Sequence, residues 1–154
     1  MALLIKNGEI VTADSRSRAD IFCEGETITR IGAGLEAPPG AQVVDAAGKY
    51  VFPGFVDPHV HITLPFMGTF AKDTYETASR AALVGGTTTL IEMCCPARTE
   101  DALAGFEHWM AQAEGRSACD FTFHMGAAKF DERTESALRK IVRRGVTSFK
   151  IFLA

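Results

Sequence analysis

Two histidines separated by one residue, His59 and His61, end the apolar run GFVDPHVH. Side chains two residues apart in a β-strand project from the same face, so both imidazoles can reach one metal ion without distortion of the backbone. Asp57 has the same parity, and a carboxylate behind a metal-bound imidazole commonly fixes the tautomer of the ring. The spacing predicts a metal site, and neutral imidazole nitrogens suit zinc. The alternative is a pair of strand histidines that make ordinary hydrogen bonds.

Lys150 lies in a second strand-like segment, TSFKIFLA, among apolar neighbours. Burial favours the neutral amine over the ammonium and lowers the pKa of a lysine from its usual value of about 10.4. A neutral amine can add carbon dioxide, and the carbamate can then give one oxygen to each of two divalent cations, an arrangement suited to hydrolysis. The alternative is a lysine at a sheet edge whose ammonium reaches solvent past its apolar neighbours.

The elements that must position these residues change character near residue 50. Short alternating runs with turn signals, such as Asn7-Gly8 and Glu24-Gly25, predict a small antiparallel β-unit over residues 1–52. Beyond it, mostly apolar strands alternate with amphipathic helices, which predicts a parallel sheet covered by helices. The predicted strands are 55–63, 87–94, 120–126 and 147–154, and the predicted helices are 73–84, 99–113 and 131–144.

A parallel sheet of this kind is either doubly wound or closed into a barrel. A (β/α)8 barrel has eight strands and about 250 residues, whereas we predict four strands in residues 53–154. An apolar strand at the end of the chain would be an open edge that invites aggregation. We therefore expect the sequence to be the N-terminal part of a longer polypeptide, or the remaining portion to be supplied separately, and we expect the isolated chain to be insoluble or molten.

Composition and charge exclude several classes of protein. With 47% apolar and 23% charged residues, the chain is globular rather than disordered. The net charge is −3 without a long block of either sign, which argues against nucleic acid or an anionic membrane as a partner. The first apolar segment is too short for a signal peptide, and the apolar runs fall short of the ~20 residues that span a bilayer, so we expect a cytoplasmic protein.

Three segments, YVFPGFVDPHVH, GGTTTLIEMC and GVTSFKIFLA, resemble the cyclic amidohydrolases, most closely the dihydropyrimidinase and hydantoinase group. The resemblance covers the whole chain and implies the N-terminal half of a TIM-like barrel, preceded by part of a small β-sandwich built from both chain ends. It implies that His59 and His61 bind one zinc ion and that carbamylated Lys150 bridges two. The other metal ligands, including the aspartate that acts as general base, would lie beyond residue 154.

The same resemblance implies zinc-dependent hydrolysis of a small cyclic amide, such as a dihydropyrimidine, a hydantoin or a related cyclic ureide or imide. The product would be an N-carbamoyl amino acid or a related acid, and the enzyme would be a homotetramer. In hydantoinases the loop that corresponds to residues 63–69 packs against the exocyclic group of the substrate. Leu64 and Phe66 are therefore candidate substrate contacts, with Phe152 as another wall of the pocket, although loop packing alone would also explain Leu64 and Phe66.

Several alternatives stay open. Thr63 stands where dihydroorotases carry an arginine, which disfavours a dihydroorotase, but an allantoinase-type hydrolase fits the pattern. A non-catalytic dihydropyrimidinase-like binding protein, as in the collapsin response mediator proteins, is a second alternative, and an independent α/β binding module is a third. Glu92 could lie behind the metal site or be an ordinary structural glutamate, and His124 could line the pocket or be a hydrogen-bonded core histidine.

Overall fold

The structure is a computed structural model that describes residues 1–151. The chain forms two compact units, Met1–Pro53 and Gly54–Ala154. The second unit carries the residues for which we predict chemistry, and each unit is described by itself.

Unit 1 consists of two small sheets with the strand orders β5-β4-β1-β6 and β3-β2-β7. The prediction of an antiparallel unit is wrong in part, because β6 runs parallel to β1 and β7 runs parallel to β2. A tight hairpin reverses the chain between two consecutive strands, whereas β6 and β7 pair with strands that lie much earlier in the sequence, so the chain can return in the parallel direction. The strands are β1 (Ala2–Lys6), β2 (Glu9–Val11), β3 (Arg16–Arg18), β4 (Asp20–Glu24), β5 (Thr27–Gly32), β6 (Gln42–Asp45) and β7 (Tyr50–Val51).

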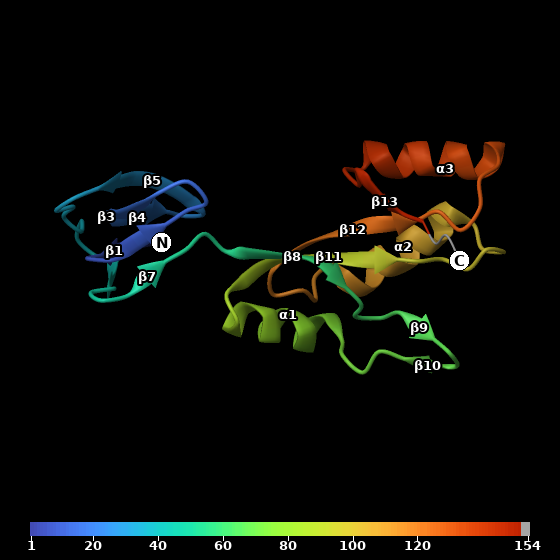
Figure 1. Cartoon of the computed structure of the whole chain (residues 1–154), viewed down its shortest axis with the longest axis horizontal. Helices are drawn as coiled ribbons and strands as arrows, with labels where there is room; N and C mark the ends of the chain where they lie inside the picture. Colours follow the sequence, from blue (N-terminus) through green and yellow to red (C-terminus); the bar gives the residue numbers. More distant parts are fainter. Residues whose placement is uncertain (152–154) are drawn as a thin grey trace. The chain divides into compact units, whose positions relative to one another are not determined.

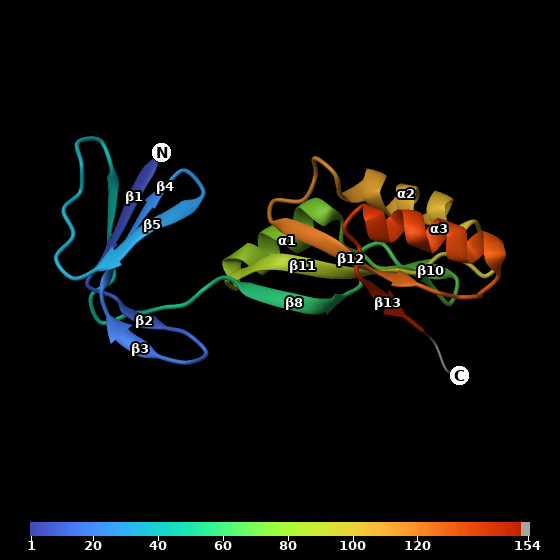
Figure 2. The same ribbon diagram turned by 90° about the horizontal axis from the view of Figure 1, so that it is seen from above.

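Unit 2 is built on a parallel sheet with the strand order β13-β12-β11-β8. Three helices follow strands of this sheet, and Figures 1 and 2 show them packed around its outer side. Alternation of strands and helices is confirmed, and the predicted bounds of β11 and β12 agree with the structure. The elements are β8 (Phe55–Val60), α1 (Tyr75–Val84), β11 (Thr87–Cys94), α2 (Ala102–Ala113), β12 (Asp120–Gly126), α3 (Glu132–Arg143) and β13 (Ser148–Lys150).

A short hairpin follows β8 where we predicted a loop over residues 63–69. Strands β9 (Pro65–Phe66) and β10 (Thr69–Phe70) pair in an antiparallel arrangement. The turn between them places both of its residues at positive φ, with Met67 at 48° and Gly68 at 80°. Both views show this hairpin and the end of β13 at the same end of unit 2 (Figures 1 and 2).

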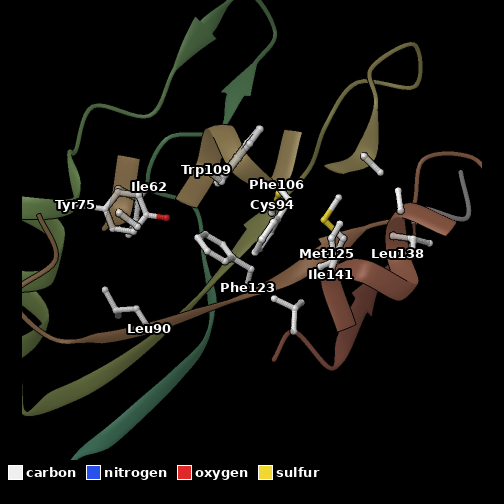
Figure 3. Close-up of a cluster of buried hydrophobic side chains, with 14 residues drawn as sticks. Ile62, Tyr75, Leu90, Cys94, Phe106, Trp109, Phe123, Met125, Leu138 and Ile141 are labelled. Carbon is white, nitrogen blue, oxygen red and sulfur yellow. The ribbon is translucent and has the colours of Figure 1, made fainter. Parts of the chain in front are cut away.

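The core of unit 2 lies between the sheet and the helices. Phe123 and Met125 of β12 are fully buried there, against Phe106 of α2 and Ile141 of α3. Figure 3 shows this cluster, with Ile62 and Tyr75 at one end and the α3 side chains at the other. Burial of each large apolar side chain contributes about 1.5–3 kcal/mol, so this layer holds the helices against the sheet.

The start of α1 differs from its predicted form. We predicted a helix over residues 73–84, but α1 begins at Tyr75 and its N-cap is Thr74. The Thr74 hydroxyl accepts the backbone N–H of Thr77, and the Thr77 hydroxyl accepts that of Thr74. Asp73 instead accepts a hydrogen bond from the Thr77 hydroxyl at 2.9 Å. The observed start has a local reason, since the hydroxyls of Thr74 and Thr77 each accept the backbone N–H of the other residue and so satisfy two donors at the beginning of the helix.

Asp101 begins α2 and also connects α2 to α3. Its carboxylate accepts the backbone N–H groups of Leu103 at 3.0 Å and Ala104 at 3.1 Å. Arg133 of α3 forms an ion pair with the same carboxylate at 3.0 Å. The hydrogen bond from Ala104, followed by the contact with Arg133, holds the pKa of Asp101 below its usual value.

Replacement of Asp101 by alanine should lower the melting temperature at pH 7 by a few degrees, because two N–H groups at the start of α2 lose their acceptor. Asp101→Asn keeps an acceptor and should lose less. Since the folded pKa lies below the unfolded value of about 3.9, the contribution of the carboxylate is complete above that value and is lost as the pH falls through the folded pKa. Thermal melts between pH 7 and pH 3 test this, and an alanine penalty that stays constant with pH would contradict it.

Candidate metal site

His59 and His61 lie side by side at the carboxyl end of β8. His59 is within the strand and His61 is the first residue after the last strand residue, Val60. Their ring centroids are 5.1 Å apart with an angle of 75° between the planes. A tetrahedral zinc ion bound by two imidazole nitrogens at about 2.0–2.1 Å would put the centroids about 5 Å apart. Both side chains are exposed, and within residues 1–151 neither ring makes a hydrogen bond, so the pair fits one ion.

Asp57 holds the backbone of this segment. Its carboxylate accepts the backbone N–H of His59 at 3.1 Å. This bond fixes the main chain between the two residues rather than the orientation of an imidazole ring. A role for Asp57 behind a metal-bound imidazole therefore stays a prediction.

Glu92 holds the residues that follow His61. Its side chain is 1% exposed, and one carboxylate oxygen accepts the backbone N–H groups of Ile62 and Thr63, each at 2.9 Å. The other oxygen accepts the Tyr75 hydroxyl of α1. Burial, and then the negative charge of Glu92, raise the pKa of Tyr75, so the phenol stays protonated and able to donate. Glu92 is thus a structural acceptor on the helix side of the sheet that fixes the chain directly after the histidine pair.

Lys150 is the last residue of β13 and is half-buried. It pairs in register with Gly126 of β12, and its carbonyl oxygen accepts the N–H of Ala127 at 2.9 Å. Burial raises the pKa of the Cys95 thiol, and the charge of Lys150 partly opposes that rise. Lys150 therefore lies at the carboxyl end of the sheet, as the histidines do, but on the opposite outer strand.

Gly126 is a residue near this site that sequence reasoning missed. A Cβ atom there would lie 2.9 Å from the carbonyl oxygen of Cys94 and 3.1 Å from the Cα of Cys95. Both are backbone atoms and cannot move aside as a flexible side chain would. The close approach of β11 to β12 beside Lys150 therefore requires glycine, and only the tertiary contact reveals it.

The structure brings together some of the predicted site residues. His59 and His61 adjoin, and Lys150 shares their end of the sheet. Within the part of the chain that the structure describes, no group of three or more histidine, cysteine, aspartate or glutamate side chains is placed to hold a metal ion. The predicted metal ligands within residues 1–151 are the two imidazoles and the lysine.

The three residues predicted to contact the substrate lie in different surroundings. Leu64 is half-buried and packs against the core cluster of unit 2, which is the loop-packing alternative. Phe66 lies in β9, at the hairpin after the histidine pair. Phe152 lies outside the described residues. Substrate contacts for these three residues stay predictions.

A cavity of about 510 Å³ adjoins the hairpin, on the helix side of the sheet. Residues of the hairpin, α1 and α2 line it, including Phe70, Tyr75 and Trp109. Neither the histidine pair nor Lys150 is among its described lining residues, so this cavity and the predicted metal site are different places.

Comparison with known proteins shows which enzymes this chain is similar to. Residues 42–117 match the model of the Amidohydrolase family, whose members are metal-dependent hydrolases. A D-hydantoinase from Geobacillus stearothermophilus is 41% identical over the whole chain, and Dihydropyrimidinase 2 from Caenorhabditis briggsae is 36% identical. These alignments cover 33% and 30% of the two relatives, so the chain spans about a third of their length.

Solved structures narrow the relationship. A D-hydantoinase (dihydropyrimidinase) from Thermus sp. matches 99% of this chain and 33% of its own, with 71% identity and a TM-score of 0.96. A dihydroorotase matches at 18% identity with a TM-score of 0.67, which is a likeness of fold alone. Over its whole length the chain is therefore similar to the N-terminal third of D-hydantoinases and dihydropyrimidinases, and the predicted half of a TIM-like barrel is confirmed. Among residues 1–151, no helix is long and apolar enough to cross a membrane.

Glu92→Gln should destabilise the protein by about 1–3 kcal/mol, because the amide cannot accept from all three buried donors and at least one of them stays unpaired. Glu132→Gln, at an exposed position of α3, is the matched control and should change little. Urea titration measures both variants, and hydrogen exchange of residues 61–64 reports the segment directly. Equal midpoints for the Glu92 and Glu132 variants would contradict this role of Glu92.

Proposed function

We propose that this chain supplies the first part of a binuclear zinc site in a hydrolase that opens small cyclic amides. The pair of imidazoles at the carboxyl end of the first barrel strand carries the proposal, because their centroid separation of 5.1 Å suits one shared ion. Similarity to D-hydantoinases and dihydropyrimidinases supports dihydropyrimidines, hydantoins or related cyclic ureides and imides as substrates.

Each residue has a separate task in this proposal. His59 and His61 would hold one zinc ion, and Lys150, as its carbamate, would be a ligand of two. When bound, the two ions would lower the pKa of a water molecule and polarise the carbonyl group under attack. Carbon dioxide is therefore part of the proposed cofactor set, and the general base comes from beyond residue 154.

The chain itself positions the donors. Asp57 and Glu92 hold the main chain before and after the histidine pair by hydrogen bonds to the N–H groups of His59, Ile62 and Thr63. This leaves the imidazoles unengaged by other residues of the described chain, so they meet the ion with little rearrangement. The hairpin that follows, with Leu64 and Phe66, and then Phe152, would border the substrate, and the product would be an N-carbamoyl amino acid or a related acid.

The proposal extends to the whole protein. Following the resemblance, we propose a cytoplasmic homotetramer whose partner is a small-molecule substrate. The alternative of a non-catalytic relative differs in two measurable properties, since such a protein would lack the metal and the carbamate while it kept the fold.

Metal content and the mass of Lys150 in the full-length protein test the proposal. We expect about two zinc ions per chain and a carbon dioxide adduct on Lys150 under native conditions. Removal of zinc with a chelator should abolish hydrolysis of dihydrouracil or hydantoin and release the adduct, and zinc with bicarbonate should restore both.

Variants assign the ligands. His59→Ala and His61→Ala should each lose zinc, whereas His108→Ala, at an exposed position of α2, should keep the parent content. Metal-free protein with unmodified Lys150, even after zinc and bicarbonate are supplied, would reject the hydrolase and favour the non-catalytic alternative.

A further inference from the structure

His124 lies on the side of the sheet opposite the helices. It occupies β12 between Phe123 and Met125, whose side chains are buried beneath α2 and α3. Successive side chains of a strand point to opposite faces, so His124 points toward the concave side of the sheet. This is the side where a barrel encloses its interior, and the carboxyl ends of its strands carry the active site.

Both ring nitrogens of His124 have partners on other strands. Nε2 lies 2.9 Å from the carbonyl oxygen of Pro58 in β8, and Nδ1 lies 2.5 Å from the hydroxyl of Ser148 in β13. A carbonyl oxygen can only accept, so Nε2 carries the hydrogen. In the neutral ring Nδ1 then accepts a hydrogen bond from Ser148, and the two bonds fix one tautomer.

The partners of His124 adjoin the proposed metal ligands. Pro58 immediately precedes His59, and Ser148 lies two residues before Lys150, on the same face of its strand. β8 and β13 are the two outer strands in the order β13-β12-β11-β8, so no backbone ladder joins them directly in the described sheet. The ring of His124 therefore connects the strand of the histidines to the strand of the lysine.

Strand β8 needs such a connection because its pairing with β11 is irregular. The register shifts between Leu90 and Glu92 of β11, opposite the segment that contains Pro58. Pro58 itself has no N–H to give to a ladder. A side-chain donor to its carbonyl oxygen thus holds a stretch of backbone that regular strand pairing holds poorly.

We infer that His124 is a positioning residue of the metal site, which sets the spacing between the histidine pair and Lys150 through its two hydrogen bonds. The inference rests on the proposed metal-binding role of these residues. Partners that orient metal ligands typically change metal affinity by about 10–100-fold when they are removed. Loss of His124 should therefore weaken zinc binding while the apolar layer beneath the helices keeps the fold.

The test uses the full-length protein with His124→Phe, which keeps the ring volume and removes both hydrogen bonds. We expect the zinc dissociation constant, measured by competition with a chromophoric chelator, to rise by about 10–100-fold, with the melting temperature of the zinc-free protein within a few degrees of the parent. His124→Gln, which can still donate to Pro58, should recover part of the affinity. His108→Phe, a histidine on α2 outside the site, should bind zinc as the parent does.

A second variant and a metal-independent measurement separate the possible failures. Ser148→Ala removes one of the two hydrogen bonds of His124 and should raise the zinc dissociation constant by less than His124→Phe does. If His124→Phe does not fold, Ser148→Ala tests the role of His124 in its place. Hydrogen exchange of residues 55–61 in zinc-free protein should speed up in His124→Phe. Zinc affinity and exchange equal to those of the parent would overturn the role of His124 and leave the proposed function intact. A parent that binds no zinc would instead refute the proposed function, and the exchange rates alone would then decide whether His124 holds β8.

Discussion

Parallel strand pairing brings the predicted metal ligands of this chain to one end of the sheet. When β8, β11, β12 and β13 run in the same direction, their carboxyl ends meet at one end of the sheet, so residues about ninety positions apart in sequence can share a site. His59 and Lys150 reach that end from the two outer strands of the sheet. Helices α1, α2 and α3 cover one face of the sheet and bury the core that keeps the four strands in register.

Two polar side chains, one on each face of the sheet, hold the backbone around the histidine pair where strand pairing alone is irregular. Glu92 works from the helix side and holds the N–H groups of Ile62 and Thr63, after the histidine pair. His124 works from the concave side and holds the carbonyl oxygen of Pro58, before His59. A buried or half-buried polar group is stable only when its hydrogen bonds are made. Loss of either contact would therefore leave a polar group without its partner and destabilise the protein. Hydrogen bonds therefore hold the backbone both before His59 and after His61, and they come from opposite faces of the sheet.

A half barrel also leaves two strand edges with apolar side chains exposed. Phe55 and Val56 of β8 are 51% and 54% exposed, and Phe149 of β13 is 44% exposed. An apolar groove of about 610 Å³ runs along α3 and β13 and continues this exposed surface. Uncovered edges of this kind are prone to pair with other chains, so the expected poor solubility of the isolated chain stays a prediction with a structural reason.

The sequence by itself determined the alternation of strands and helices, the half barrel and the relationship to the hydantoinase group. Apolar strands bounded by turn signals located β11 and β12 at their observed bounds, and the HxH spacing identified the imidazole pair, because both are local patterns. Only the tertiary structure decided the parallel placement of β6, the need for glycine at position 126, and the roles of Glu92 and His124. Those depend on hydrogen bonds and close contacts between residues distant in sequence, such as the 66 positions between Pro58 and His124, and periodicity along the chain carries no information about which distant groups meet.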